Sequence, residues 1–176
     1  YLYFSVLTGC LRVAKESIFT GLNNFKVYPI TNVAFDEYFG FTDFEVKEIL
    51  KYYHQTGQYE TVKTWYDGYH FGDVDIYCPW DVICFCEDHR ESPDLAPQNY
   101  WLNTSGNQII RHFIETMGSQ SQLTKTDLEL LLNGSSVQRT IRQELTYKDL
   151  YSSPENLWSA LFMTGYLTQK GLPDGD

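Results

Sequence analysis

Residues that could bind an anion follow an apolar run at the start of the chain. Residues 1–7 are apolar apart from one serine, the run ends in Thr8-Gly9, and two cations follow at Arg12 and Lys15. A hydroxyl at the end of a buried strand, with a guanidinium and an ammonium on the loop beyond it, can hold an anion through charge-assisted hydrogen bonds. Thr8, Arg12 and Lys15 are therefore candidate anion-binding residues. A turn hydroxyl and two solvated surface charges are the alternative interpretation.

The glycine-rich loop that cradles nucleotide phosphates is absent from this sequence. In such a loop the backbone amides and a Lys hold the phosphates, and the adjacent Ser or Thr hydroxyl holds magnesium. No stretch of the chain has the required Gly-Lys-Ser or Gly-Lys-Thr ending. Because the sequence starts within the apolar run, we expect it to be part of a longer protein. We also expect the chain by itself neither to hydrolyse ATP nor to bind it tightly.

The composition is typical of a globular protein and argues against binding of nucleic acid. The 176 residues are 43% hydrophobic and 20% charged, and their formal net charge is −10. Nucleic-acid-binding domains usually carry a basic surface. Only Arg139, Arg142 and Lys148 cluster, and Glu144 and Asp149 offset their charge. No apolar run is long enough to cross a bilayer, so we expect no membrane association. The four cysteines in a chain of this size favour a cytoplasmic location.

The cysteines favour a reducing compartment. A domain of this size does not need disulfides, so Cys10, Cys78, Cys84 and Cys86 are expected to be reduced thiols. Cys84, Cys86 and His89 fall in or beside an apolar segment that is predicted to be helical. Positions 84 and 86 point to nearly opposite sides of a helix, which does not suit a tetrahedral zinc site. We therefore expect no metal here.

Helical patterns dominate the rest of the chain. Residues 42–45 have the spacing of a capping box, and Gly57 is expected to end the helix that follows. Pro79 suits the start of another helix, as does the run 153–155, which reads Ser-Pro-Glu. A capping pattern at residues 124–127 predicts a helix that ends at Asn133-Gly134, and Gly165 is expected to end the last helix. The apolar stripes of these helices are Val46, Ile49, Leu50 and Tyr53; Leu128, Leu131 and Leu132; and Leu157, Trp158, Leu161 and Phe162.

Short strands are expected at a few places only. Residues 65–72, aromatic and rich in glycine, are predicted to form a packed turn with Asp67-Gly68 as its tight pair, and residues 73–77 a short strand. Residues 137–145 and 166–168 have strand-like patterns. The chain is thus predicted to be mainly α with a few short strands, and its end has the helix-strand-helix-strand outline of a small winged-helix-like module.

Several blocks of the sequence resemble, in order, a family of predicted AAA-ATPase-like proteins. The blocks extend over nearly the whole chain and are distinctive together; they are residues 7–24, 35–42, 65–72 with 76–80, 100–105 and 161–168. Bacterial members of the family often carry a nuclease-like domain of the PD-(D/E)XK type. The resemblance implies that residues 1–24 end the ATPase-like core with a remnant of a P-loop-type core strand. Residues 25–115 would then form a helical lid, and residues 116–176 the winged-helix-like subdomain.

The resemblance also implies roles for individual residues. Thr8 matches the polar sensor near the terminal phosphate of the nucleotide, and Arg12 and Lys15 match polar positions of the same motif. ATP and Mg would be bound by the intact protein, with the rest of the ATPase core and the nuclease-like domain as partners. Cys78 departs from the family pattern, in which Asn usually precedes the Pro-Trp pair.

Two other functions stay open at this stage. The chain could be a non-catalytic protein-interaction module, with the aromatic turn at residues 65–71 and the winged-helix-like end as a docking surface. Nucleic-acid binding by that end is the weaker alternative. The aromatic turn itself is better explained as part of the lid core than as a platform for stacking bases. The paired acids Asp36-Glu37 and Asp73 with Asp75 are better explained as solvated faces than as general acid/base groups.

Overall fold

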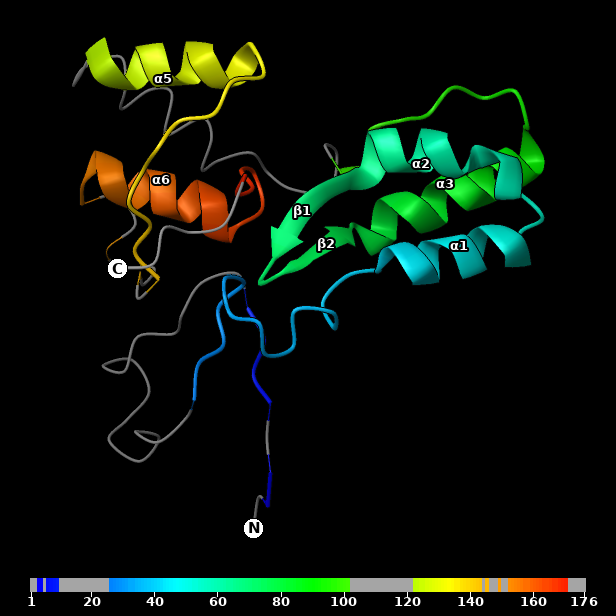
Figure 1. Cartoon of the computed structure of the whole chain (residues 1–176), viewed down its shortest axis with the longest axis horizontal. Helices are drawn as coiled ribbons and strands as arrows, with labels where there is room; N and C mark the ends of the chain where they lie inside the picture. Colours follow the sequence, from blue (N-terminus) through cyan, green and yellow to red (C-terminus); the bar gives the residue numbers. More distant parts are fainter. Residues whose placement is uncertain are drawn as a thin grey trace. The chain divides into compact units, whose positions relative to one another are not determined.

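The computed structural model describes residues 3–4, 6–9, 26–101, 122–143, 145, 149 and 152–170. The described residues form mostly helix, with one small antiparallel sheet (Figure 1), which confirms the mainly α class with few strands. The elements are α1 (Asp43–Tyr52), the 3-10 helix η1 (Thr56–Gln58), α2 (Tyr59–Tyr66), β1 (Asp67–Phe71), β2 (Val74–Tyr77), α3 (Pro79–Glu91), α5 (Gln122–Leu132) and α6 (Pro154–Met163).

The chain divides into two compact units. Unit 1 comprises Tyr1–Val27 and Gln108–Leu167, and unit 2 comprises Tyr28–Asn107 and Thr168–Asp176. Each unit has its own buried apolar cluster among the described residues. The three-part division into core end, lid and winged-helix-like subdomain stays a prediction.

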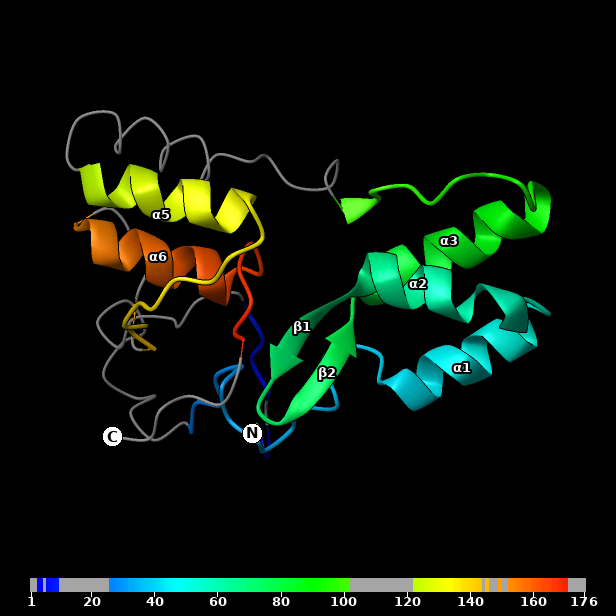
Figure 2. The same cartoon turned by 45° about the horizontal axis from the view of Figure 1, so that its top comes forward.

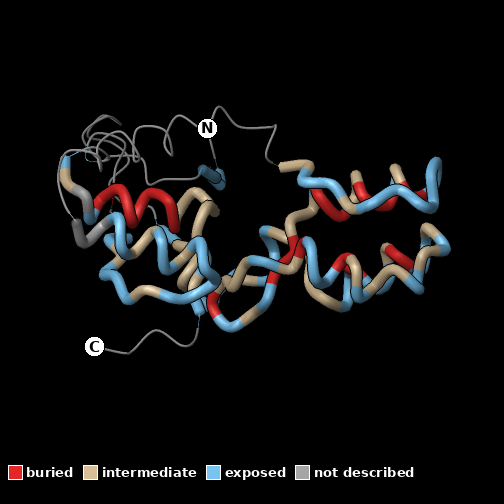
Figure 3. Tube along the Cα trace, turned by 90° about the horizontal axis from the view of Figure 1, so that it is seen from above, coloured by how far each residue is buried: buried red, intermediate tan, exposed pale blue. Residues whose placement is uncertain are grey.

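The core of unit 2 is formed by α1, α2, α3 and the strand β2. Its buried members are Val46, Leu50, Val62, Tyr66, Tyr77, Val82, Phe85 and Cys86. In Figure 3, buried stretches alternate with exposed ones along the helices, as expected for helices that bury one face. The apolar stripe predicted for α1 is confirmed, because Val46 and Leu50 are buried and Ile49 and Tyr53 pack against the cluster.

Local signals set the start of α1. Thr42 precedes the helix in extended conformation, its hydroxyl accepts from the Glu45 backbone N–H (3.4 Å), and the Glu45 carboxylate accepts from the Thr42 N–H (2.9 Å). These paired bonds form the predicted capping box and satisfy two backbone donors that lack helical partners.

The end of α1 differs from the prediction. The helix stops at Tyr52, because His54 takes the left-handed conformation (φ 58°) and Gln55 N–H donates back to Leu50 O (2.7 Å). This six-residue closure ends the helix before Gly57, which lies in η1. A His at this position gives no sequence signal, because glycine is the usual residue there.

The hairpin turn also lies at a different place from the predicted one. Residues 65–72 are not a packed turn: α2 runs to Tyr66, and Asp67-Gly68 lie in β1 beside a register shift. The strands pair antiparallel through Phe71 opposite Val74, so Gly72-Asp73 form the turn, and Gly72 has a positive φ of 51°. The predicted strand at residues 73–77 is confirmed as β2.

In unit 1, α5 and α6 pack side by side (Figure 2). Leu128 and Leu131 of α5 contact a buried cluster on α6 made of Leu157, Trp158 and Leu161. The predicted starts and ends of α6 are confirmed. Ser153 caps it by accepting from Asn156 N–H (3.2 Å), and after Gly165 (φ 83°) the Tyr166 N–H returns to Leu161 O (2.9 Å).

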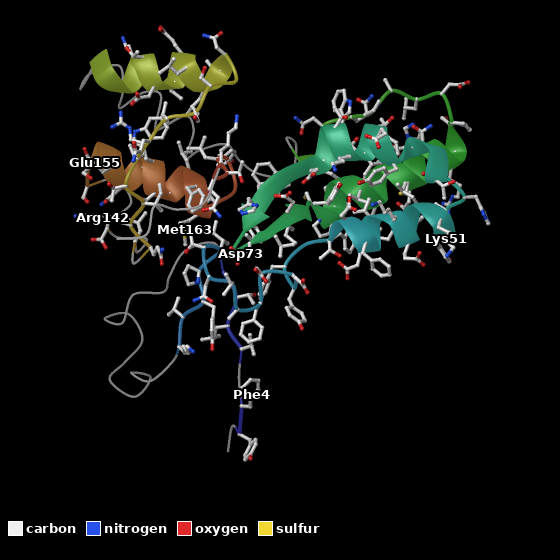
Figure 4. All side chains as sticks on the ribbon, in the orientation of Figure 1. Phe4, Lys51, Asp73, Arg142, Glu155 and Met163 are labelled. Carbon is white, nitrogen blue, oxygen red and sulfur yellow. The ribbon has the colours of Figure 1, made fainter. Side chains whose placement is uncertain are left out.

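Three predicted strands are not seen. The described residues within 1–9 lie in no strand, and Phe4 is 78% exposed and Leu7 72% (Figure 4 labels Phe4). The described residues of the ranges 137–145 and 166–168 form no strand either. A strand needs a neighbour for its backbone hydrogen bonds, and the sheet of the described residues contains β1 and β2 only.

Candidate functional site

The described part of the chain does not assemble the predicted anion site. Thr8 lies in an exposed segment outside any helix or strand. Arg12 and Lys15 lie outside the described residues. The phosphate-sensing role of these three residues therefore stays a prediction.

A group of exposed aromatic side chains lies on residues 28–44, which we call the aromatic segment. Side chains of this size are usually buried, and an exposed group of them often marks a site of interaction. Their exposed fractions are 41% for Tyr28, 51% for Phe35, 76% for Tyr38, 61% for Phe39 and 72% for Phe44.

The rings at one end of the aromatic segment contact one another. The Phe35 ring lies edge-on to Tyr28 at 4.9 Å between centroids and to Tyr38 at 6.0 Å. Phe35 has a left-handed backbone (φ 71°), which is unfavourable for a residue with a bulky side chain. The Tyr38 N–H donates to Phe35 O (3.2 Å) and closes the turn. The segment thus holds an exposed ring in a fixed but strained backbone.

The tip of the hairpin anchors the aromatic segment. Gly72 N–H donates to Ile30 O (2.9 Å), and Asp73 N–H donates to Asp36 Oδ2 (3.2 Å). Figure 4 labels Asp73 at this tip. A Cβ at position 72 would lie 2.5 Å from Asp36 Oδ2, so Gly72 is required by its neighbours as well as by its backbone conformation. Asp36, expected on a solvated face, instead joins two parts of unit 2.

A second anchor lies at the far end of the segment. Phe41 and Tyr77 exchange backbone hydrogen bonds, with Phe41 N–H to Tyr77 O at 3.1 Å and Tyr77 N–H to Phe41 O at 2.8 Å. The segment is therefore fixed to β2 at one end and to the hairpin tip near its middle.

Asp43 at the start of α1 has its charge compensated by structural partners. Lys47 Nζ donates to Oδ2 (2.6 Å), and the hydroxyls of Tyr59 (2.6 Å) and Tyr77 (3.0 Å) donate to Oδ1. These bonds, led by those of Lys47 and Tyr59, lower the pKa of Asp43 to about 2. Burial, followed by the bond to Asp43, raises the pKa of Tyr77. Asp43 is thus a structural group, which leaves Asp36 and Glu37 as the carboxylates among the exposed rings.

A histidine and a carboxylate face each other across the hairpin. His70 Nδ1 lies 2.7 Å from Asp75 Oδ1, and the two residues are direct partners in the strand register. The hydroxyl of Thr168 accepts from His70 N–H (3.0 Å), and Gln169 Nε2 donates to His70 O (3.3 Å). A carboxylate on Nδ1 fixes the orientation of the imidazole, as in general-base pairs. These contacts also explain the pair as a clip that holds residues 168–169 against β1.

The aromatic stretch 65–71 is divided between the core and the surface. Tyr66 is buried against Phe85 (5.7 Å between centroids), and its hydroxyl donates to Gln98 O (3.0 Å). Burial raises the pKa of Tyr66 to about 12. Trp65 is exposed, and Tyr69 and Phe71 are half-buried. The stretch contributes to the core of unit 2 through Tyr66, while the more exposed aromatic group lies on residues 28–44.

Cys84 and Cys86 are free thiols within α3, and Cys78 is the free thiol that directly precedes it. Burial raises the pKa of Cys86 to about 11 and also raises that of Cys78, so neither is prepared to act as a thiolate. His89 is buried, stacks on Phe85 at 3.8 Å, and places Nδ1 3.2 Å from Phe85 O. Among the residues that the structure describes, no group of three His, Cys, Asp or Glu side chains could hold a metal ion.

One buried carboxylate lies at the start of the same helix. Asp81 is 9% exposed, and its Oδ1 has no hydrogen-bond partner among the described atoms. Burial raises the pKa of Asp81, against a bond with Cys78 that lowers it. Asp81 lies near the backbone of Trp101, and the residues that follow Trp101, 102–121, lie outside the described part.

The arginines considered for nucleic-acid binding are engaged inside unit 1. Arg139 forms an ion pair with Asp127 and lies over the Trp158 ring at 5.8 Å. Arg142 donates through Nη1 to Asn156 Oδ1 (3.2 Å). Lys148 lies outside the described residues. The two arginines thus have structural roles in holding residues 139–142 to α5 and α6.

The described helices include none that is both long and apolar enough to cross a membrane. The cytoplasmic location stays a prediction.

Comparison with known proteins gives one distant relative. A protein of Azotobacter chroococcum mcd 1, described as an uncharacterized protein in vnfD 5'region, is 24% identical over 101 residues. The match covers 57% of this chain and 18% of the relative, so the chain spans less than a fifth of that protein's length. No family model and no solved structure matches the chain significantly.

Proposed function

We propose that this chain is the lid and sensor part of an AAA-like ATP-binding protein. The resemblance of the ordered sequence blocks at residues 7–24, 35–42, 65–72 with 76–80, 100–105 and 161–168 is the observation that carries the proposal. The rest of the ATPase core would supply the phosphate loop and hold ATP and Mg. The helical lid would close on ATP, and this closure would relay the presence of the nucleotide to an attached nuclease-like domain.

Three residues carry the sensing role in this proposal. Thr8 is exposed, so its hydroxyl is accessible to a phosphate oxygen. Arg12 and Lys15 would place positive charge where the transferred phosphoryl group develops negative charge, which is the main way proteins accelerate phosphoryl transfer. The remainder of the chain would act by closing over the nucleotide and by excluding water.

Some of the family blocks hold positions where packing is tight. Gly40 lies in one block and Gly72 in another, and both approach neighbouring groups too closely for a side chain. Pro79, at the first position of α3, lies in a third. The resemblance therefore coincides with residues that position the helices within residues 25–115, which supports the proposed lid there.

The proposal is tested in the full-length protein that contains this chain. Arg12→Ala and Lys15→Ala should each lower ATP turnover at least about tenfold, because each removes a charge near the phosphate. Lys51→Ala is the control, since Lys51 is a 70% exposed cation on α1 whose Nζ lies 3.5 Å from Glu48 Oε1. Unchanged turnover in Arg12→Ala and Lys15→Ala would refute the sensing role.

The isolated chain gives a second test. Calorimetric titration of the 176 residues with MgATP should give no micromolar binding, because the sequence lacks a phosphate loop. Micromolar affinity would contradict the assignment of the chain to the lid side of the nucleotide site.

A further inference from the structure

We propose that the aromatic segment (residues 28–44) is a docking surface for a cationic polypeptide segment that presents arginine or lysine side chains to its rings. The proposal is independent of the ATPase assignment, because it concerns unit 2 alone and requires no nucleotide. It rests on the exposure of the rings, on their fixed arrangement and on the sign of the surrounding charge.

The exposed rings suit a cationic partner. Ring faces attract ammonium and guanidinium groups, and arginine also stacks on them. The Phe35 ring stands at 88° to Tyr28 and at 66° to Tyr38, so adjacent rings offer faces in different directions to one extended chain. Phe39 is also exposed, and so is Phe44 in the first turn of α1.

The segment is arranged before any partner binds. Phe35 is held at a positive φ, and the hairpin tip fixes the neighbouring backbone through Gly72 N–H to Ile30 O and Asp73 N–H to Asp36 Oδ2. Strained backbone that its surroundings maintain is often found at binding sites. A surface that is already ordered loses little conformational entropy on binding. These contacts favour a binding role over an incidental exposure of apolar rings.

Charge complementarity selects the class of partner. Residues 27–46 contain no Lys, Arg or His. Of their four carboxylates, Asp43 is paired with Lys47 and Glu45 caps α1, which leaves Asp36 and Glu37 beside the exposed rings. The chain as a whole has a formal net charge of −10. An acidic peptide or a nucleic acid would be repelled here, whereas a basic segment would be attracted and oriented. A cationic polypeptide is therefore the occupant that fits both the rings and the charge.

The test uses the whole 176-residue chain and two labelled peptides. One peptide alternates Arg and Gly over twelve residues, and the other replaces every Arg with citrulline, which has nearly the same shape and no charge. Fluorescence anisotropy should show the arginine peptide binding at least about tenfold more tightly, with an affinity that falls as salt is added. Equal binding of the two peptides, or binding of neither, would overturn the proposal.

Matched variants separate this surface from general attraction to an acidic protein. Tyr38→Ala and Glu37→Gln should weaken binding of the arginine peptide by about fivefold to tenfold. Tyr52→Ala removes a ring that is 80% exposed on α1, and Glu91→Gln removes an exposed carboxylate at the end of α3; both should leave the affinity unchanged. Circular dichroism checks that each variant is folded. Equal losses in the test and control variants would refute a specific surface on residues 28–44.

Discussion

Gly40 approaches β2 so closely that a hydrogen is the largest side chain that fits. A Cβ at this position would overlap Ile76 Cγ2 and lie 3.0 Å from Tyr77 O. Ile76 is 1% exposed and Tyr77 is fully buried, so neither can move aside easily. The glycine therefore lets the aromatic segment lie directly on the strand that leads into α3.

Gly40→Ala should destabilise unit 2 by about 1–3 kcal/mol, the usual cost of forcing extra volume into a packed core. Thermal unfolding would show this as a fall of roughly 4–8 °C in Tm per kcal/mol for a unit of this size. Gly57→Ala is the control, because a Cβ at Gly57 meets no atom within 4 Å. If both variants melted at the temperature of the unsubstituted chain, the close packing at Gly40 would be wrong.

Single residues differ in how far the sequence reveals their roles. Thr42 and Glu45 were predictable as a capping box because their function depends on a spacing of three residues. Gly72 was included in the predicted turn at residues 65–72 but not as part of its tight pair, since its conformation is tied to Asp36 and Ile30, which are more than thirty residues away along the chain. The aromatic segment was also missed as a surface. The sequence pattern that could have predicted it is a stretch with several aromatic residues and no cation, between Lys26 and Lys47.

At the scale of elements, α6 depends on its first turn. The Ser153 hydroxyl accepts from Asn156 N–H (3.2 Å), and Pro154 occupies the first helical position. The helix then buries Leu157, Trp158 and Leu161, which form the cluster that α5 contacts. A weakened start of α6 would therefore destabilise the whole buried cluster of unit 1.

Ser153→Ala should destabilise unit 1 by about 1 kcal/mol, because the N-cap acceptor is lost and a backbone N–H is left without its partner. Chemical denaturation would measure the change through the fluorescence of Trp158, in a chain whose other tryptophans have been replaced. Ser153→Asp should retain nearly full stability, since its carboxylate also accepts at an N-cap and favours the helix dipole. Equal stability of the Ala and Asp variants would show that the cap contributes nothing.

Helices were predicted more accurately than strands for a physical reason. The ends of α5 and α6 were found because Gly134 (φ 77°) and Gly165 (φ 83°) follow them, and the signals for a helix lie within a few residues. The end of α1 was misplaced because His54 takes the position that glycine usually occupies. A strand depends on a partner that can lie anywhere in the chain, so the strand-like patterns at residues 1–7 and 137–145 did not suffice to predict the backbone of their described residues, which lie in no strand.

At the scale of the whole molecule, the described residues form two units whose buried clusters share no member. Unit 2 buries residues of α1, α2, α3 and β2, and unit 1 buries residues of α5 and α6. Compact regions with separate cores often unfold as separate cooperative units. The sequence did not indicate this division, because unit 2 includes residues after 167 that lie far along the chain from its helices.

Calorimetry of the chain should therefore show two unfolding transitions, and the substitutions above identify them. Gly40→Ala should lower the temperature of one transition and leave the other unchanged, while Ser153→Ala should do the reverse, because each acts on a different buried cluster. The double variant should show both shifts at their single-variant sizes, since substitutions that act on separate buried clusters are usually additive. A single transition that both substitutions shift equally would mean that the two clusters unfold as one unit.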